Sequence, residues 1–173
     1  VNIRNPRLHV IRWYRVWLEP YWPPWRSSDK LYRPLTTLTL RANAILTGYP
    51  LQARPFRIVN LLLHALTSVG VVILAWRLTS SHIAGGLAGL LFATHPVHTE
   101  AVVTIYGRSE LLAGCFGAWL LAVYLKPLAN GQHPIHNILL CSLLFFAAVA
   151  SKEHAIFLWP GLILIDLWRR RSH

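Results

Sequence analysis

The sequence predicts an all-α integral membrane protein: a polytopic helical bundle of about five transmembrane helices, preceded by an amphipathic interfacial segment. Of its 173 residues, 54% are hydrophobic and only 13% are charged, which is too little charge to cover a soluble domain. The mean hydropathy of +0.42 agrees. A helix needs about 20 residues to cross roughly 30 Å of hydrocarbon. The apolar runs that approach this length are Ile58–Trp76, Ile83–Thr94, Leu111–Leu125, Ile138–Ala150 and Ala155–Leu167.

Residues 1–57 predict an interfacial, Trp- and Arg-rich external loop, and residues 58–173 the transmembrane bundle. Within the first domain, His9–Leu18 and Leu35–Leu46 each read as an amphipathic helix, and Gly48 and Pro50 end the second. Tryptophan favours the headgroup level of a bilayer, where one edge of its ring is wet. The tryptophans expected at that level are Trp13, Trp17, Trp22 and Trp25.

Alternating spans bring residues 1–57, Thr94–Glu110 and Ser151–His154 to one membrane face, here named side A. Five of the six acids fall on this face, which are Glu19, Asp29, Glu100, Glu110 and Glu153. When all Lys and Arg are counted, the excess of positive charge favours a cytoplasmic side A. When only short loops and helix ends are counted, the excess lies on the opposite face and favours that face as the cytoplasmic one. We adopt the second count, because long segments weigh little in this rule, so side A is expected to be periplasmic or lumenal.

The basic charge favours anionic lipid headgroups or phosphate-bearing ligands as partners. Ten of the seventeen Lys and Arg precede residue 58, beside the membrane domain, and no nucleic-acid-binding motif accompanies them, so no nucleic acid is expected. Cys115 and Cys141 lie in apolar runs and predict no disulfide framework. Because the chain contains no Met and shows no signal peptide, we expect it to be a processed product or part of a longer chain.

Two histidines and a glutamate open the polar stretch between the second and third apolar runs. His95, His98 and Glu100 carry side chains that suit a divalent metal. Their spacing lacks the i, i+4 geometry of helical zinc sites, so hydrogen bonding at the interface or contact with a substrate is the other reading. In this second reading Pro96 marks the end of a span.

Arg108 and Glu110 stand where the third apolar run begins, and a buried charge there is costly. They are read either as structural ion-pair partners of neighbouring helices or as groups for a phosphate, which the planar guanidinium suits. The two cannot face each other, because residues two apart on a helix point to different sides. The expected partners are therefore Arg33, Lys152 and His154.

Lys152, Glu153 and His154 carry the same pair of readings, as a helix cap or as contacts to a phosphate or polar substrate. The alternation predicts one membrane-surface cleft that combines the polar groups of side A. Its expected lining residues are Tyr32, Arg33, His95, His98, Glu100, Arg108 and Lys152.

His64 lies in the middle of the first apolar run. A lone histidine there is either packed and hydrogen-bonded or an axial ligand to a chlorophyll-type pigment. The second reading belongs to an alternative function. In that alternative, the chain is a non-catalytic accessory subunit of a respiratory or photosynthetic membrane complex, in contact with lipids, pigments and other membrane chains.

Four stretches together resemble the membrane domain of the transmembrane and tetratricopeptide-repeat-containing family, O-mannosyltransferase-like members of the GT-C glycosyltransferase superfamily. In chain order they are "YRPLTTLTLRAN" (Tyr32–Asn43), "NLLLHAL" (Asn60–Leu66), "ATHPVHTEAVVTIYGRSELLAG" (Ala93–Gly114) and "SKEHA" (Ser151–Ala155).

The resemblance implies a partial GT-C-like fold that transfers a sugar, expected to be mannose, from a polyprenyl-phosphate donor to a protein acceptor. It places the site on the lumenal side of the endoplasmic reticulum membrane or the periplasmic side of a bacterial inner membrane. It also implies an acidic base or metal-organising group in the first external loop. The family's first span and acidic pair are expected upstream of Val1, which leaves Glu19 and Asp29 as the catalytic candidates in this sequence.

Overall fold

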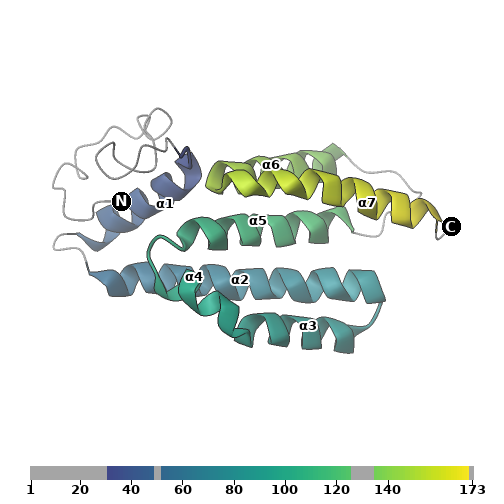
Figure 1. Ribbon diagram of the computed structural model, residues 1–173, viewed down its shortest axis with the longest axis horizontal. Coiled ribbons are helices and arrows are strands. Elements are labelled where there is room, and N and C mark those ends of the chain that lie inside the picture. Colours follow the sequence, from purple (N-terminus) through teal and green to yellow (C-terminus); the bar gives the residue numbers. More distant parts are fainter. Residues whose placement is uncertain (1–30, 49–51, 126–134, 172–173) are drawn as a thin grey trace.

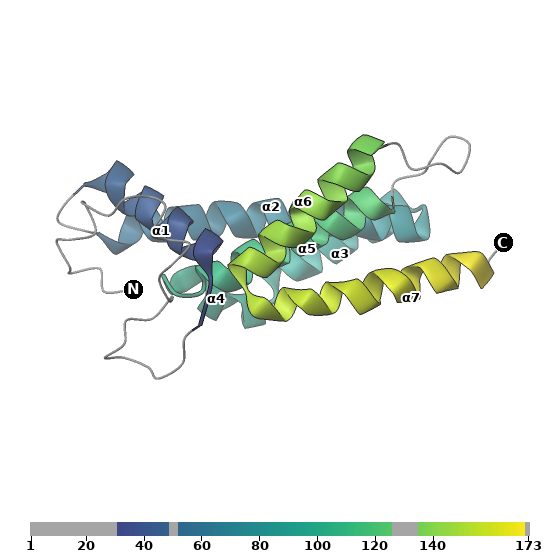
Figure 2. The ribbon, with the colours of Figure 1, turned by 90° about the horizontal axis from the view of Figure 1, so that it is seen from above.

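The computed structural model describes residues 31–48, 52–125 and 135–171, and all regular elements in these ranges are helices (Figures 1 and 2). The all-α prediction is therefore confirmed for the described residues. The α-helices are α1 (Pro34–Thr47), α2 (Ala53–Thr79), α3 (His82–Thr94), α4 (Thr99–Val103), α5 (Arg108–Tyr124), α6 (Ile135–Ser151) and α7 (Leu158–Arg171). Two 3₁₀ turns join them, η3 (Pro96–His98) and η5 (Glu153–Phe157).

The helices run alternately along one axis. In Figure 1, α2 leads away from α1, α3 turns back, and α5, α6 and α7 then alternate in the same way. Helix α5 lies at the centre, packed against α2 on one side and α6 on the other. As a result, α1, α4, the start of α5 and the α6–η5 junction all lie toward the same end of the bundle, as the alternation predicted.

The expected number of about five spans is not confirmed. Among the described helices, only α2, with 27 residues, is long and apolar enough to cross a bilayer. Helices α5 and α6 have 17 residues each, or about 25 Å at 1.5 Å per residue. Helix α3 has 13, and the run Ala155–Leu167 is divided between η5 and α7. The short helices leave the crossing count open.

Helix α2 has the surface of a lipid-facing helix. Only 22% of its most apolar window is buried, whereas the core helix of a soluble protein would bury most of it. Large apolar side chains on other helices are similarly uncovered, with exposures from 64% to 72% for the four named next. They include Leu91, Leu139, Phe146 and Phe157.

The second predicted amphipathic helix is present as α1. Pro34 occupies its first turn, where a missing N–H costs nothing, and Gly48 ends it with a φ of +70°. Helix α2 then starts at Ala53, five residues before the predicted span. The predicted helix His9–Leu18, the four interfacial tryptophans, and Glu19 and Asp29 lie outside the described residues.

Small residues let α3 approach α2 closely. A Cβ added to Gly89 would lie 2.1 Å from Cγ2 of Val72, and one added to Gly85 would lie 2.9 Å from the Val72 carbonyl oxygen. The glycine pair four residues apart therefore serves as the helix contact that such spacing indicates in membrane proteins.

A buried guanidinium group joins α1, α2 and α5. Arg108 is 0% exposed, and its Nε donates to Oδ1 of Asn60 at 2.6 Å. Its Nη2 donates to Oδ1 of Asn43 and to the Phe56 carbonyl oxygen, both at 3.0 Å. The Phe56 side chain beside it belongs to a small core with Leu40 and Ala44. This Arg108 hub fixes three helix ends against one another.

Asn60 extends the hub to α4. Its Nδ2 donates to the carbonyl oxygens of Thr104 at 2.8 Å and Val102 at 3.2 Å, near the end of that short helix. Carbonyl groups at a helix end lack partners within the helix, so a buried amide there replaces the water that lipid excludes. One asparagine thus binds both Arg108 and the segment that precedes it.

We predict that Arg108→Met, which keeps most of the side-chain length, lowers the free energy of unfolding by about 3 kcal/mol or more. The loss arises because two amide oxygens and a carbonyl oxygen stay buried without their donor. Lys152→Met is the control, since its ion pair is partly exposed and such pairs contribute about 0–1 kcal/mol. Thermal unfolding in detergent measures both, and equal losses would contradict the hub.

We further predict that Gly107→Ala destabilises the protein by about 1–3 kcal/mol, the cost of overpacking. An added Cβ would lie 2.3 Å from the carbonyl oxygen and 2.6 Å from Cα of Ala101, so backbone would have to move. Gly114→Ala is the matched control in α5, where nothing lies within 4 Å, and it should stabilise by about 0.5–1 kcal/mol. The same unfolding measurement tests the pair, and a Gly107→Ala protein as stable as wild type would contradict the tight contact.

Candidate functional site

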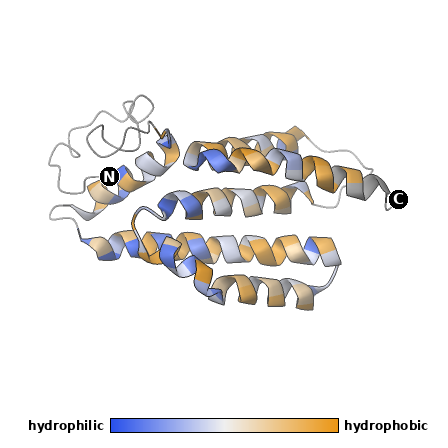
Figure 3. Cartoon of the chain, viewed as in Figure 1, coloured by the Kyte–Doolittle hydropathy of each residue, from blue (hydrophilic) through white to orange (hydrophobic). Residues whose placement is uncertain are grey.

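A cleft of about 420 Å³ opens at the end of the bundle where side A was predicted. It is lined from the residue before α1, from the η3–α4 segment and from the first turn of α5. Figure 3 shows hydrophilic residues gathered at the start of α5 and a more hydrophobic surface toward its other end. The lining residues are Arg33, Val97, His98, Glu100, Ala101, Thr104, Tyr106, Gly107 and Glu110.

Ion pairs form one side of the cleft, here named the ion-pair wall: Arg33 and Glu110, with the residues Glu153 and Lys152 that hold them. Arg33 donates to both carboxylate oxygens of Glu153, from Nη2 at 2.6 Å and from Nε at 2.9 Å. Lys152 Nζ donates to Oε1 of Glu110. The wall thus ties the start of α1 to the ends of α5 and α6.

These ion pairs identify the cations that balance the negative charges of Glu110 and Glu153. Lys152 is the partner of Glu110, as one of the three expected residues, whereas Arg33 pairs with Glu153 instead. His154 is 70% exposed and lies 3.8 Å from Glu153, Nδ1 to Oε1. The hydrogen bonds from Arg33, aided by its charge, lower the pKa of Glu153 from 4.5 to about 2 despite some burial.

The η3–α4 segment and the connection from α4 to α5 supply a second group of lining residues, here named the α4 wall: His98, Glu100, Thr104 and Tyr106. The Tyr106 hydroxyl donates to Oε1 of Glu100 at 3.3 Å. Thr104 Oγ1 donates to the Glu100 carbonyl oxygen at 2.7 Å and accepts from the Gly107 N–H at 3.2 Å. Within the described ranges, no cation makes an ion pair with Glu100.

Aromatic contacts hold His98 at the rim of the α4 wall. The centroid of its ring lies 4.2 Å from that of Phe92, 5.2 Å from that of His64 and 6.0 Å from that of His95. Burial lowers the pKa of His98, and the neighbouring His64 and His95 lower it further. A pKa below the usual 6.5 favours the neutral imidazole over the charged form at neutral pH.

The group of ligands that the metal reading requires does not assemble in the described part of the chain. There, no three His, Cys, Asp or Glu side chains stand together in a way that could hold a metal ion. His95 instead accepts a hydrogen bond from the Val97 N–H at 3.2 Å through Nδ1 and caps η3. His95 and His98 thus show the hydrogen-bonding and packing contacts of the second reading.

His64 and Arg108 lie inside the bundle. His64 is 7% exposed, stacks on Phe92, and its Nε2 lies 3.1 Å from the Ala93 carbonyl oxygen, as in a packed, hydrogen-bonded histidine. Arg108 is buried in the hub and does not line the cleft, contrary to the prediction. Tyr32 is 51% exposed and likewise does not appear in the lining.

Several residues of the site carry no separate prediction from the sequence. Tyr106, Thr104 and Ser109 belong to the polar stretch but have ordinary surface residue types. Asn60 is a polar interruption of an apolar run, and that is the one signal that could have pointed to the hub.

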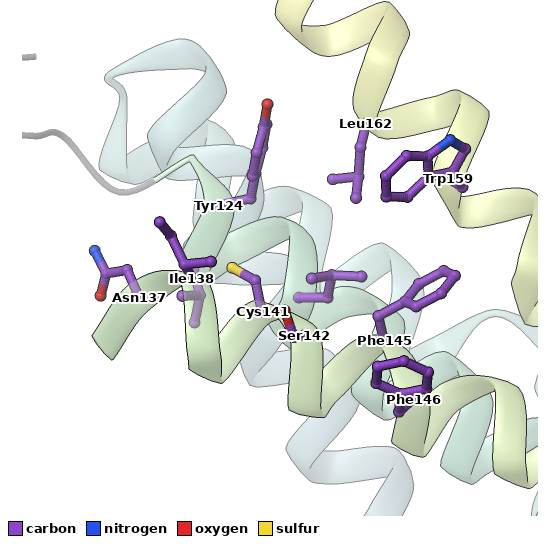
Figure 4. Close-up of a pocket in the computed structure, with 11 residues that line it drawn as sticks. Tyr124, Asn137, Ile138, Cys141, Ser142, Phe145, Phe146, Trp159 and Leu162 are labelled. Carbon is purple, nitrogen blue, oxygen red and sulfur yellow. The ribbon is translucent and has the colours of Figure 1, made fainter. Parts of the chain in front are cut away.

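A second hollow, of about 370 Å³, lies between α5, α6 and α7 (Figure 4). Aromatic and aliphatic side chains such as Phe145, Trp159 and Leu162 surround it, and its polar lining residues are neutral: Tyr124, Asn137 and Ser142. It offers no charged group, so the polar cleft is the site with reactive chemistry.

Comparison with known proteins gives a consistent set of relatives. The chain is 37% identical over 134 residues to the human protein O-mannosyl-transferase TMTC3, and 35% identical over 164 residues to human TMTC4. It is 34% identical over 151 residues to the Caenorhabditis elegans protein O-mannosyl-transferase F38B6.6. These alignments cover 75%, 82% and 84% of this chain. No family model and no solved structure matches.

The same alignments cover only 14%, 22% and 20% of the three relatives, so the chain spans about a seventh to a fifth of their length. The aligned stretch includes most of this chain, and the identities agree across human and nematode sequences. The chain belongs to the family of the TMTC proteins, whose curated members are named protein O-mannosyl-transferases.

Proposed function

We propose that this chain is part of a membrane-bound GT-C-type glycosyltransferase that transfers mannose from a polyprenyl-phosphate donor to a protein acceptor. The polar cleft at one end of an apolar bundle is the observation that carries the proposal. A lipid-linked donor needs such a place, because its phosphate and sugar lie at the membrane surface while its tail stays in hydrocarbon. The names of the relatives support mannose and a protein acceptor.

In this reaction the bond between the sugar and the phosphate oxygen breaks, and a bond forms between the sugar and an acceptor oxygen, which loses its proton. The departing phosphate gains negative charge. Preorganised cations stabilise such charge most effectively in a site that excludes water. Arg33 lines the cleft and Lys152 pairs with the lining residue Glu110, so we assign the donor phosphate to the ion-pair wall.

The donor phosphate then competes with carboxylates for these cations. The planar fork of Arg33 matches a phosphate as well as it matches Glu153, so one bidentate partner can replace the other. Arg108 takes no direct part in this assignment and acts by positioning the floor of the cleft. The catalytic carboxylate stays assigned to the first external segment, where Glu19 and Asp29 are the candidates.

The cleft faces the lumen of the endoplasmic reticulum, or the periplasm in a bacterial membrane, as the charge of the short loops favours. The shorter helices α3, α5, α6 and α7 complete a polytopic bundle within a longer protein. Some of these helices are shorter than the bilayer is thick. Their contacts with neighbouring helices hold them in the bundle, and the membrane can thin locally to match their length.

We predict that Arg33→Gln in the intact protein weakens binding of polyprenyl-phosphate mannose at least about tenfold, because a charge-assisted bidentate contact is lost. Arg33→Lys should recover part of the affinity, since it restores the charge without the fork. Arg54→Gln is the control, an exposed arginine on the same side that does not line the cleft. Equal affinities for the Arg33→Gln and Arg54→Gln proteins would refute the assignment of the phosphate.

The ion-pair wall also predicts a pH dependence of stability. Because the folded protein lowers the pKa of Glu153 from 4.5 to about 2, the pair stabilises the fold above pH 4.5 and loses this effect as the pH falls toward 2. The difference in unfolding midpoint between wild type and Glu153→Gln should be constant at neutral pH and shrink across that window. A difference that grows toward low pH would show that Arg33 does not hold the carboxylate.

A further inference from the structure

We infer that the α4 wall is the subsite for the sugar of the donor, with Glu100 and Tyr106 as the residues that bind its hydroxyl groups. The inference rests on the proposed function and assigns different parts of the donor to the two walls of the cleft. The ion-pair wall takes the phosphate, and the α4 wall takes the carbohydrate ring.

The charges of the two walls orient the donor. Among the described residues, the Glu100 carboxylate accepts a hydrogen bond from the Tyr106 hydroxyl and makes no ion pair, so an approaching phosphate would meet like charge. The neutral imidazole of His98 adds no attraction for an anion. In the ion-pair wall, Arg33 and Lys152 are each paired with a carboxylate that a phosphate can replace as their anionic partner. The phosphate is therefore directed to one wall and the uncharged sugar to the other.

The chemistry of the α4 wall suits a polyhydroxy ligand. A carboxylate accepts charge-assisted hydrogen bonds from hydroxyl groups, which are about twice as strong as neutral ones. Tyr106 is 54% exposed, so its ring can cover the C–H face of a sugar while its hydroxyl holds Glu100 in place. The cleft volume of about 420 Å³ lies in the range of roughly 300–1,000 Å³ typical of small-molecule sites.

The wall is also held in place before a ligand arrives. Asn60 binds the carbonyl groups at the end of α4, and Thr104 bonds to both Glu100 and Gly107 through its hydroxyl group. A preorganised wall loses little conformational entropy on binding, which favours selectivity for one arrangement of hydroxyl groups.

The test measures binding of two probes to the intact protein in lipid nanodiscs, polyprenyl phosphate that carries mannose and polyprenyl phosphate without sugar. Glu100→Gln should weaken binding of the sugar-loaded probe about tenfold and leave the sugar-free probe unchanged. Tyr106→Phe, which keeps the ring, should weaken the sugar-loaded probe about threefold. Thr99→Ala, an exposed neighbour outside the lining, is the control and should affect neither.

Two results would overturn the sugar subsite while leaving the proposed function intact. One is a Glu100→Gln protein that binds both probes as wild type does, and the other is equal weakening of both probes. Wild-type protein that binds neither probe would overturn the proposed function itself. Because Glu100 and Tyr106 are both exposed and touch little else, both variants should fold, and their unfolding midpoints verify this.

Discussion

Arg108 places a guanidinium group where neither water nor lipid can satisfy it, and the surrounding protein is arranged around its hydrogen bonds. Its N–H groups donate hydrogen bonds to the Asn43 side chain of α1, and to the Asn60 side chain and the Phe56 carbonyl oxygen of α2. An apolar environment makes each unmet donor or acceptor expensive, so these elements have little freedom to separate. The position of α4 follows in turn, because the Asn60 side chain also binds its last carbonyl groups.

The shape of the cleft follows from these buried hydrogen bonds around Arg108 and Asn60. Its α4 wall lies within ten residues of Arg108 in sequence, and its ion-pair wall joins residues next to α1, α5 and α6. Buried polar contacts thus determine position, whereas the partly exposed ion pairs at the surface can exchange partners at small cost. Rigid support and replaceable contacts together are what a site for a charged ligand requires.

The sequence was sufficient for the helical class and for the meeting of distant polar segments at one end, because alternating runs leave only one arrangement of their connections. Helix geometry excluded Arg108 as the partner of Glu110 and left Arg33, Lys152 and His154 as candidates. The structure pairs Lys152 with Glu110. The burial of Arg108 was not predictable, because nothing in the spacing of Asn43 and Asn60 shows that their amides meet one guanidinium. The number of spans was also beyond reach. A run such as Ala155–Leu167 reads as continuous, but the chain changes from 3₁₀ to α geometry within it.

The side chains that line the cleft come from helix ends and short connections, while the middle of α5 provides the tightly packed core. Residues at such ends can change type without altering the volume that neighbouring helices must fill. Evolution can therefore explore new ligand preferences at Glu100 or Tyr106 one substitution at a time, with the bundle unchanged. Arg108 and Asn60 have no such freedom, since altering either requires simultaneous replacement of several partners. Family members with different substrates should accordingly differ in the residues at the rim of this cleft and share the buried Arg108 and Asn60.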